Sequence, residues 1–173
     1  IMGPVMVGPS SSHTAGAVKI GRVARKLMAQ PILHADILLY GSFLATGKGH
    51  GTPYAIVAGL LGMMPDDERI PQSFEIAKEK GMSFAFGKAD LKDAHPNSVV
   101  LRLQGVDGKK LEIEGQSIGG SMINIAKIDG LAANFSGDNP TLIVHNLDQP
   151  GHVAEVTSML SHKSVNIASM QLY

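Results

Sequence analysis

Residues 97–114 have the sequence NSVVLRLQGVDGKKLEIE, and this stretch decides the fold class. Hydrophobic side chains alternate with polar ones on both sides of its centre, which is typical of strands that bury one face. The central pair, Asp107-Gly108, is a two-residue hairpin signal because both residues tolerate positive φ. The stretch therefore predicts an antiparallel β-hairpin. Its alternating hydrophobic positions are Val99, Leu101, Leu103, Leu111 and Ile113.

The pattern extends on both sides of this hairpin. A second Asp-Gly pair, Asp129-Gly130, separates two further predicted strands, so that four antiparallel strands follow one another. Upstream, the sequence predicts helices that alternate with short strands, which gives an α+β layer with helices on one side of the sheet. The predicted strands are 37–40, 83–86, 122–128 and 131–136, and the predicted helices are 13–28, 54–64 and 71–80, the last ended by Gly81.

Serines and a histidine are concentrated near the start of the chain, in the sequence GPSSSHT at residues 8–14. We expect Ser12 to be the N-cap of the helix that begins at His13, because a serine hydroxyl accepts from the free N–H groups of a first helical turn. A helix N-terminus also carries a partial positive charge. The interpretation that this is only a capping turn remains open at this point.

A similar stretch, GSFLATGKGHGT, occupies residues 41–52 and precedes the next predicted helix. Thr52 followed by Pro53 is expected to cap that helix, since proline is favoured at the first helical position. Two such loops brought together would bind an anion such as a carboxylate. A phosphate-binding P-loop fits poorly, because five residues rather than four separate Gly41 from Gly47, and Gly49 follows Lys48 where the motif needs Ser or Thr.

Composition narrows the function classes. The chain has 173 residues, 44% of them hydrophobic, and a formal net charge of +0, with no apolar run of membrane-spanning length. We therefore expect a cytoplasmic protein, not bound to a membrane. Neutral charge, few aromatic residues and no tryptophan argue against nucleic-acid binding. The chain has no cysteine, which excludes thiolate-held zinc or iron, and its histidines lack the spacing of a helical metal site.

At these motifs the chain resembles a known family, the beta chain of iron-sulfur-dependent L-serine dehydratase, also called L-serine ammonia-lyase. The resemblance rests on residues 8–16 and 41–52 and on Ser117-Ile118-Gly119-Gly120-Ser121, and it extends to about Asp138. One departure is Pro53, where family members commonly have aspartate. The resemblance implies an allosteric-substrate-binding (ASB-like) domain over residues 1–138, part of an enzyme that converts L-serine to pyruvate and ammonia.

The resemblance also implies a cofactor and a partner. A four-iron four-sulfur cluster would be held by a separate, cysteine-containing alpha chain, since this chain has no cysteine. Within this chain, His50 is the candidate base, because imidazole titrates near neutrality and glycines on both sides leave room for a ligand. Candidate ligands for the oxygens of L-serine are Ser10, Ser11, Ser12, His13, Thr14, Ser42, Thr46 and Lys48.

The C-terminal residues 139–173 resemble part of an ACT domain, a small ferredoxin-like regulatory module. A predicted strand at 141–145, a helix with Val153, Val156 and Leu160 on one face, and a strand at 165–172 give βαβ, about half of the module. Unpaired strand edges would need either the missing half of the module or a neighbouring chain, and we expect a homodimer. The resemblance suggests an effector site at the start of the helix, formed by Asp148, Pro150, Gly151 and Asn166.

Two other functions are considered. The chain could be a non-catalytic allosteric module that binds serine as an effector, and the absence of cysteine and the unpaired β-edge favour this alternative. A serine hydrolase built from Ser11 or Ser12 with His13 is disfavoured. Adjacent residues at a helix start do not place the histidine nitrogen against the serine oxygen, and the sequence has no Gly-x-Ser-x-Gly motif.

Overall fold

The computed structural model describes residues 6–173, which fall into two compact units, residues 6–140 and 141–173. The first unit contains most of the helices and the whole sheet. None of the helices in the described residues is long and apolar enough to cross a membrane. The elements of the first unit are η1 (Ser11–Gly16), α1 (Ala17–Met28), β1 (Ile32–Leu39), α2 (Gly41–His50), α3 (Thr52–Leu60), η2 (Ile70–Gln72), α4 (Ser73–Glu79), β2 (Ser83–Lys88), β3 (Ser98–Gly105), β4 (Lys110–Gly119), β5 (Met122–Ile128) and β6 (Leu131–Phe135).

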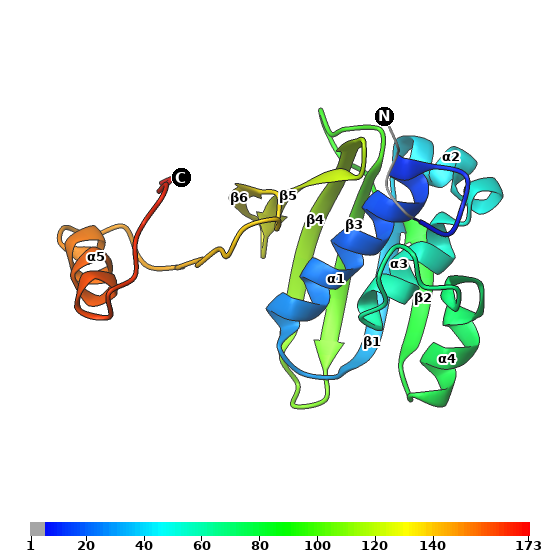
Figure 1. The fold of residues 1–173 in the computed structure, drawn as a ribbon, viewed down its shortest axis with the longest axis horizontal. Coiled ribbons are helices and arrows are strands. Elements are labelled where there is room, and N and C mark those ends of the chain that lie inside the picture. The colour runs from blue at the N-terminus through cyan, green and yellow to red at the C-terminus, as the bar shows by residue number, and fades with distance from the viewer. Residues whose placement is uncertain (1–5) are drawn as a thin grey trace. The chain divides into compact units, whose positions relative to one another are not determined.

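One six-stranded sheet organises this unit, in the order β2-β1-β3-β4-β5-β6 (Figure 1). The predicted hairpin is β3–β4, in which Leu101 lies opposite Ile113, and the α+β layer is confirmed. The sheet is larger than the four antiparallel strands expected, since β1 and β2 extend it. These two strands pair in parallel, because the helices α2, α3 and α4 connect them as a crossover.

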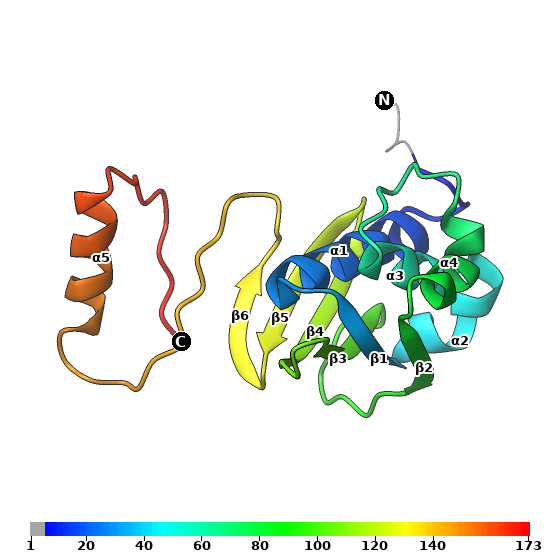
Figure 2. The same cartoon turned by 90° about the horizontal axis from the view of Figure 1, so that it is seen from below.

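The helices α1 and α3 lie over one face of the sheet and pack against each other (Figure 2). Gly21 and Gly59 make that contact possible. A Cβ at Gly21 would lie 2.5 Å from the carbonyl oxygen of Ile56, and one at Gly59 would overlap the carbonyl oxygen of Val18. The two helix backbones therefore touch, which brings the first and second sequence motifs to the same end of the unit.

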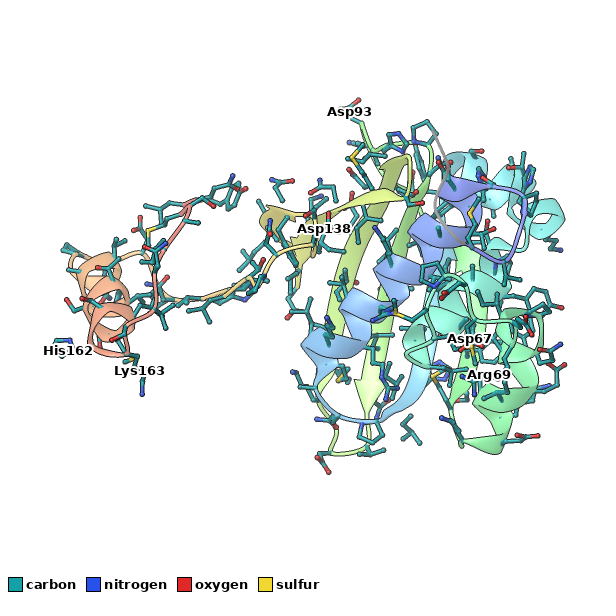
Figure 3. The ribbon with its side chains drawn as sticks, viewed as in Figure 1. Asp67, Arg69, Asp93, Asp138, His162 and Lys163 are labelled. Atoms are coloured by element: carbon teal, nitrogen blue, oxygen red, sulfur yellow. The ribbon has the colours of Figure 1, made fainter. Side chains whose placement is uncertain are left out.

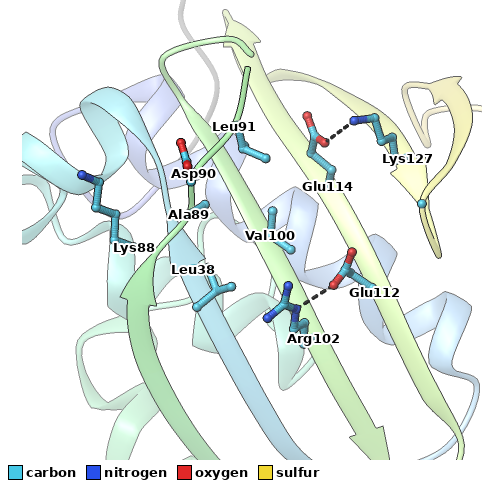
Figure 4. A pocket seen from close by; sticks show the side chains of 11 residues that line it. Leu38, Lys88, Ala89, Asp90, Leu91, Val100, Arg102, Glu112, Glu114 and Lys127 are labelled. Carbon is cyan, nitrogen blue, oxygen red and sulfur yellow. Dashed lines mark hydrogen bonds and ion pairs between the residues drawn. The ribbon is translucent and has the colours of Figure 1, made fainter. Parts of the chain in front are cut away.

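The opposite face of the sheet is polar. Arg102 on β3 donates to Glu112 on β4 across 2.6 Å, and Lys127 on β5 lies 3.3 Å from Glu114 (Figure 4). These pairs line a hollow of about 420 Å³ that also includes Leu38. Both charged pairs are cross-strand neighbours, so they stabilise strand pairing.

An ion pair lies within the connection between α3 and α4. The guanidinium of Arg69 donates to both carboxylate oxygens of Asp67, at 2.9 and 2.7 Å (Figure 3). These side-chain hydrogen bonds, with a further one from the Arg69 backbone N–H, lower the pKa of Asp67 to about 2. The ion pair therefore favours the conformation of the turn just before η2.

The second unit has one regular element, α5 (His152–His162). Its helix was predicted, but the strands expected at 141–145 and 165–172 are not formed within the described residues 141–173. Two short strands do not form a stable sheet without further strands to pair with. None of the residues of α5 is buried. On the apolar helix face that the sequence predicts, Val153 is 46% exposed and Val156 and Leu160 are half-buried, so this face is only partly covered within the unit.

Candidate functional site

The first motif begins a helix two residues earlier than expected. Ser10, not Ser12, is the N-cap, since its Oγ accepts from the backbone N–H of His13 at 3.1 Å. The turn that follows, η1, is a π-helix, which is wider than an α-helix and often occurs at functional sites. Ser12 instead contributes its carbonyl oxygen, which accepts from Ser117 Oγ at 3.0 Å.

The second motif is a helix rather than the loop predicted from its glycines. Its stretch from Gly41 to His50 forms α2, and its N-terminus is not free to bind an anion. The backbone N–H groups of Ser42 and Phe43 both donate to the carbonyl oxygen of Pro96, at 2.7 and 3.5 Å. Gly41 is required here, because its φ is +54° and a Cβ would lie 2.5 Å from the same oxygen.

Thr52 does not cap α3, contrary to expectation. The residue before the helix is Gly51, at φ +73°, and Thr52 is already helical. Its Oγ1 is buried and has no hydrogen-bond partner among residues 6–173. The side chain packs against Gly47, where a Cβ would lie 3.2 Å from Thr52 Cβ, so it holds α2 and α3 close together.

His13 is the centre of a hydrogen-bonded cluster that joins the two motifs. Its Nε2 lies 3.2 Å from Ser42 Oγ and 3.1 Å from Thr46 Oγ1, and these hydroxyls lie 3.3 Å from each other. Its Nδ1 lies 3.4 Å from Ser10 Oγ. The ring of His50 is 5.0 Å from the ring of His13, measured between centroids. Five of the predicted site residues therefore form one cluster.

The environment of His13 favours its neutral form. Burial, and next the neighbouring charge of His50, lower the pKa of His13 below the ordinary histidine value of 6.5. A neutral imidazole can accept a hydrogen bond at one ring nitrogen and donate one at the other. His50, in contrast, is exposed at the C-terminal end of α2. The cluster thus has one partly buried imidazole and one that solvent or a ligand can reach.

Other predicted residues lie around this cluster or apart from it. Thr14 is buried, and its Oγ1 donates to the carbonyl oxygen of His50 at 3.5 Å. Lys48 is exposed, and its position on α2 places it on a different side from Ser42, Thr46 and His50, which recur every four residues. The effector candidates Asp148, Pro150 and Gly151 precede α5, whereas Asn166 lies in the irregular segment after it.

The sequence did not indicate the residues that hold the two motifs next to each other. The backbone of Asn97 pairs with Ser117, whose N–H donates to Asn97 O at 2.9 Å, and Asn97 Nδ2 donates back to Ser117 O at 3.4 Å. Ser117 reaches Ser12, and the neighbouring Pro96 holds α2. Nothing in the composition of residues 95–98 marks them, and only the resemblance of the motif at 117–121 pointed to this corner.

Comparison with known proteins assigns the chain to a family. A family model described as serine dehydratase beta chain matches residues 2–127, most of the chain and all three motifs. The chain belongs to the serine dehydratase beta chain family. It is 43% identical over 171 residues to the L-serine dehydratase beta chain of Peptoniphilus asaccharolyticus, covering 98% of this chain and 77% of the relative.

Other members of the serine dehydratase group show the same likeness. A probable L-serine dehydratase beta chain of Bacillus subtilis is 42% identical over 172 residues, covering 99% of this chain and 78% of the relative. L-serine dehydratase 1 of Escherichia coli is 30% identical over 145 residues. That match covers 69% of this chain but only 31% of the relative, so the region corresponding to this beta chain is a minor part of a longer polypeptide.

Residues 6–173 of this beta chain do not themselves offer a site for a metal or a cluster. It has no cysteine, and the described residues contain no group of three or more His, Asp or Glu side chains placed to hold a metal ion. The ligand set of an iron-sulfur cluster is thiolate. The donor chemistry of this chain therefore does not fit the cluster that the resemblance implies.

Proposed function

We propose that this chain is the beta subunit of an L-serine dehydratase, which together with an alpha chain converts L-serine to pyruvate and ammonia. The observation that supports the proposal is the cluster around His13, in which Ser42, Thr46 and His50 come from the second family motif and Ser10 from the first. The names of the relatives state the same activity.

The cluster supplies the groups that an elimination reaction needs on this chain. In the proposed reaction His50 takes the proton from the α-carbon of L-serine, and the bond between the β-carbon and the hydroxyl breaks, which gives aminoacrylate. The departing hydroxide becomes water with the proton that His50 returns, so that the base is regenerated. Aminoacrylate tautomerises to an imine, and one water hydrolyses it to pyruvate and ammonia. His50 suits the role of base because it is exposed and lies at the edge of a hydroxyl-rich cluster.

The hydroxyl groups would bind and orient the substrate. Ser42 and Thr46 are one helical turn apart on α2, and both contact His13 Nε2. Hydroxyl groups both donate and accept, so they can bind a carboxylate or the substrate hydroxyl. We propose further contacts to the substrate from Ser10, Ser11, Ser12 and Thr14. Lys48 is proposed as a more distant electrostatic contact for the substrate carboxylate.

The alpha chain is proposed as the source of the cluster. This chain has no cysteine, and residues 6–173 contain no group of side chains placed to bind iron. We therefore propose that the thiolate ligands of the cluster come from another polypeptide. The much longer Escherichia coli relative supports the need for additional sequence. As a test, purified beta chain incubated anaerobically with iron and sulfide should remain colourless and inactive, and a brown, thiolate-like absorbing beta chain would contradict the proposal.

Activity should appear only when the two chains are combined. The measurement is pyruvate formed from L-serine by the beta chain, by the alpha chain and by their mixture, with D-serine as the control substrate. We expect turnover of L-serine by the mixture alone. Turnover by the beta chain on its own, or no turnover by a co-purified complex that contains iron, would overturn the proposed function.

We further propose that residues 139–173 are part of an ACT-like unit that binds an effector. Support comes from the position of Asp148, Pro150 and Gly151 at the start of α5, an 11-residue helix, with Asn166 in the segment that follows. The exposed apolar side chains of the unit would also contribute to self-association. A chain truncated after Asp138 should keep the first unit folded, self-associate more weakly and lose effector dependence, and unchanged sedimentation together with unchanged regulation would contradict this role.

A further inference from the structure

The strand β2 forms one edge of the sheet and carries little protection against pairing with another strand. It pairs with β1 alone among the described residues, and that pairing runs from Ser83 to Lys88 without a register shift. Ser83, Ala85, Phe86 and Lys88 are exposed. It contains neither proline nor a bulge, and a regular, exposed edge strand invites pairing with a second chain.

The opposite edge of the sheet differs. The edge strand β6 is five residues long, its pairing with β5 shifts register between Ile125 and Lys127, and Asn134 has a φ of 45°. Such irregularities interrupt the row of outward hydrogen-bonding groups that a second strand would need. Only the β2 edge is therefore regular enough to continue the sheet.

The backbone groups of β2 that point outward can be identified. Ala89 follows the strand directly, and its N–H donates to the carbonyl oxygen of Leu39 on β1 at 2.9 Å. Because a strand alternates the direction of its backbone groups, residues 83, 85 and 87 face β1 as well. The N–H and C=O groups of Phe84, Phe86 and Lys88 consequently face away from the sheet.

An aromatic cluster lies on the helix side of this edge. Phe74 stacks on Tyr54 with ring centroids 4.0 Å apart, and it lies 4.8 Å from Phe84 and 5.7 Å from Phe86. The cluster is only partly covered, since Phe86 is 40% and Tyr54 is 38% exposed. Exposed aromatic groups of this kind are enriched at protein interfaces.

We propose that β2 pairs antiparallel with β2 of a second copy of this chain, about a two-fold axis at Ala85. In this register Phe84 of each copy lies opposite Phe86 of the other, and both residues present outward backbone groups, so the two strands exchange hydrogen bonds. The four phenylalanines of the two strands then line one face of a continuous sheet. An interface of this kind uses the same surface on both copies, as a two-fold dimer requires.

Charge and side-chain size agree with a second copy as the partner. The turn before β2 carries Lys80 and the segment after it carries Asp90, and neither forms an ion pair within residues 6–173. Antiparallel pairing brings the Lys80 end of each copy to the Asp90 end of the other. On the face away from the helices, Ser83 meets Gly87 and Ala85 meets Ala85, so small side chains allow close approach. This inference does not depend on the proposed function.

Crosslinking tests the proposal directly, because the chain has no cysteine of its own. Across the two-fold axis, Ala85 and its copy form a non-hydrogen-bonded pair with Cα atoms about 4.5 Å apart, a separation that a disulfide spans. The full chain with Ala85→Cys should therefore form a disulfide dimer under mild oxidation. Ser83→Cys is the register control, since its two thiols would be offset by four residues, about 13 Å, and should not crosslink.

Sedimentation of the full chain provides the second measurement. Ala85→Lys places two like charges opposite each other at the axis and should raise the dissociation constant of this interface about tenfold or more. Ala132→Lys on β6 is the matched control, because Ala132 is also an exposed edge alanine on the same face of the sheet, and it should leave assembly unchanged. The proposal is overturned if the parent chain sediments as a monomer up to about 100 μM, if Ala85→Lys assembles as the parent does, or if Ser83→Cys crosslinks while Ala85→Cys does not.

Discussion

The two motifs that meet at the candidate site have opposite construction. In the first, Ser10 to Gly16, polar groups are turned inward and bonded to one another, as in the contact between Ser10 and the N–H of His13. The second motif is a helix whose N-terminus is closed by Pro96 and whose C-terminal turn, with His50, is exposed. We infer from this difference that the two motifs have different roles. The first motif orients polar side chains, and the second exposes the candidate base, His50.

The strongest test of these different roles is replacement of His50. If it is the base, His50→Ala should lower kcat of the assembled enzyme by about two to four orders of magnitude. Lys48→Ala is the matched control on the same helix, and it should act mainly on KM, because a remote carboxylate contact affects binding more than the chemical step. A near-normal kcat with a shifted serine dependence for His50→Ala would instead indicate the non-catalytic, allosteric role.

Replacement of His13 should have a smaller effect. His13→Gln removes the ring nitrogen that both Ser42 Oγ and Thr46 Oγ1 contact, and each of these two hydrogen bonds is worth about 0.5 to 1.5 kcal/mol. We expect kcat/KM to fall about tenfold to a hundredfold, with assembly unchanged. Steady-state kinetics of His13→Gln and His50→Ala, measured together, compare their kcat/KM values. If kcat/KM of His13→Gln falls as far as that of His50→Ala, the two motifs do not have different roles.

The cap of the first motif should contribute to the stability of the fold. Ser10→Ala removes the hydroxyl that accepts from His13 N–H and should lower the free energy of unfolding by about 1 kcal/mol. Ser11→Ala, one residue along, is the control, because Ser11 is not the cap. Urea denaturation measures both. Equal stability of the two variants would mean that the cap does not hold the first motif in place.

The smallest expected effect is a pH dependence of stability. Burial and the charge of His50 lower the pKa of His13, so the unfolded chain binds a proton at His13 more readily than the folded chain. Stability from this group is therefore fully present above pH 6.5, the ordinary histidine value, and is lost as the pH falls through the lowered pKa. Unfolding experiments between pH 8 and pH 5 should show a shallower acid loss for His13→Gln than for the parent chain, and parallel curves would argue against the lowered pKa.

Local patterns predicted most of the sheet but not the form of the second motif. Alternation at Leu101 and Ile113 identifies the central hairpin without any knowledge of the rest of the chain. The glycines at 47, 49 and 51 look like a loop, and α2 forms because Gly47 permits close packing on Thr52 and because Pro96, some fifty residues away, caps the first turn. A helix stabilised by contacts so distant in sequence has no local signal.

The candidate site was predicted in part for a similar reason. Motif chemistry pointed to His13, Ser42 and Thr46, and the structure brings them together. The placement of Lys48 follows from the helical period of α2, which could not be applied while that stretch was interpreted as a loop. After residue 140 a local pattern was present but the structure did not form. Apolar alternation predicted strands there, but a strand also needs a partner strand, and residues 141–173 provide none.

The wide turn η1 also makes the first motif sensitive to insertion and deletion. Hydrogen bonding from each residue to the fifth one along holds one residue more per ring than an α-helix does. Deleting a single residue between Ser11 and Gly16 would let the segment continue α1 as a regular helix, which by itself is a favourable conformation. The same deletion would rotate Ser10 and His13 by about 100° relative to α1, away from Ser42 and Thr46. In this chain, the length of the first motif therefore positions Ser10 and His13 as much as their side-chain contacts do.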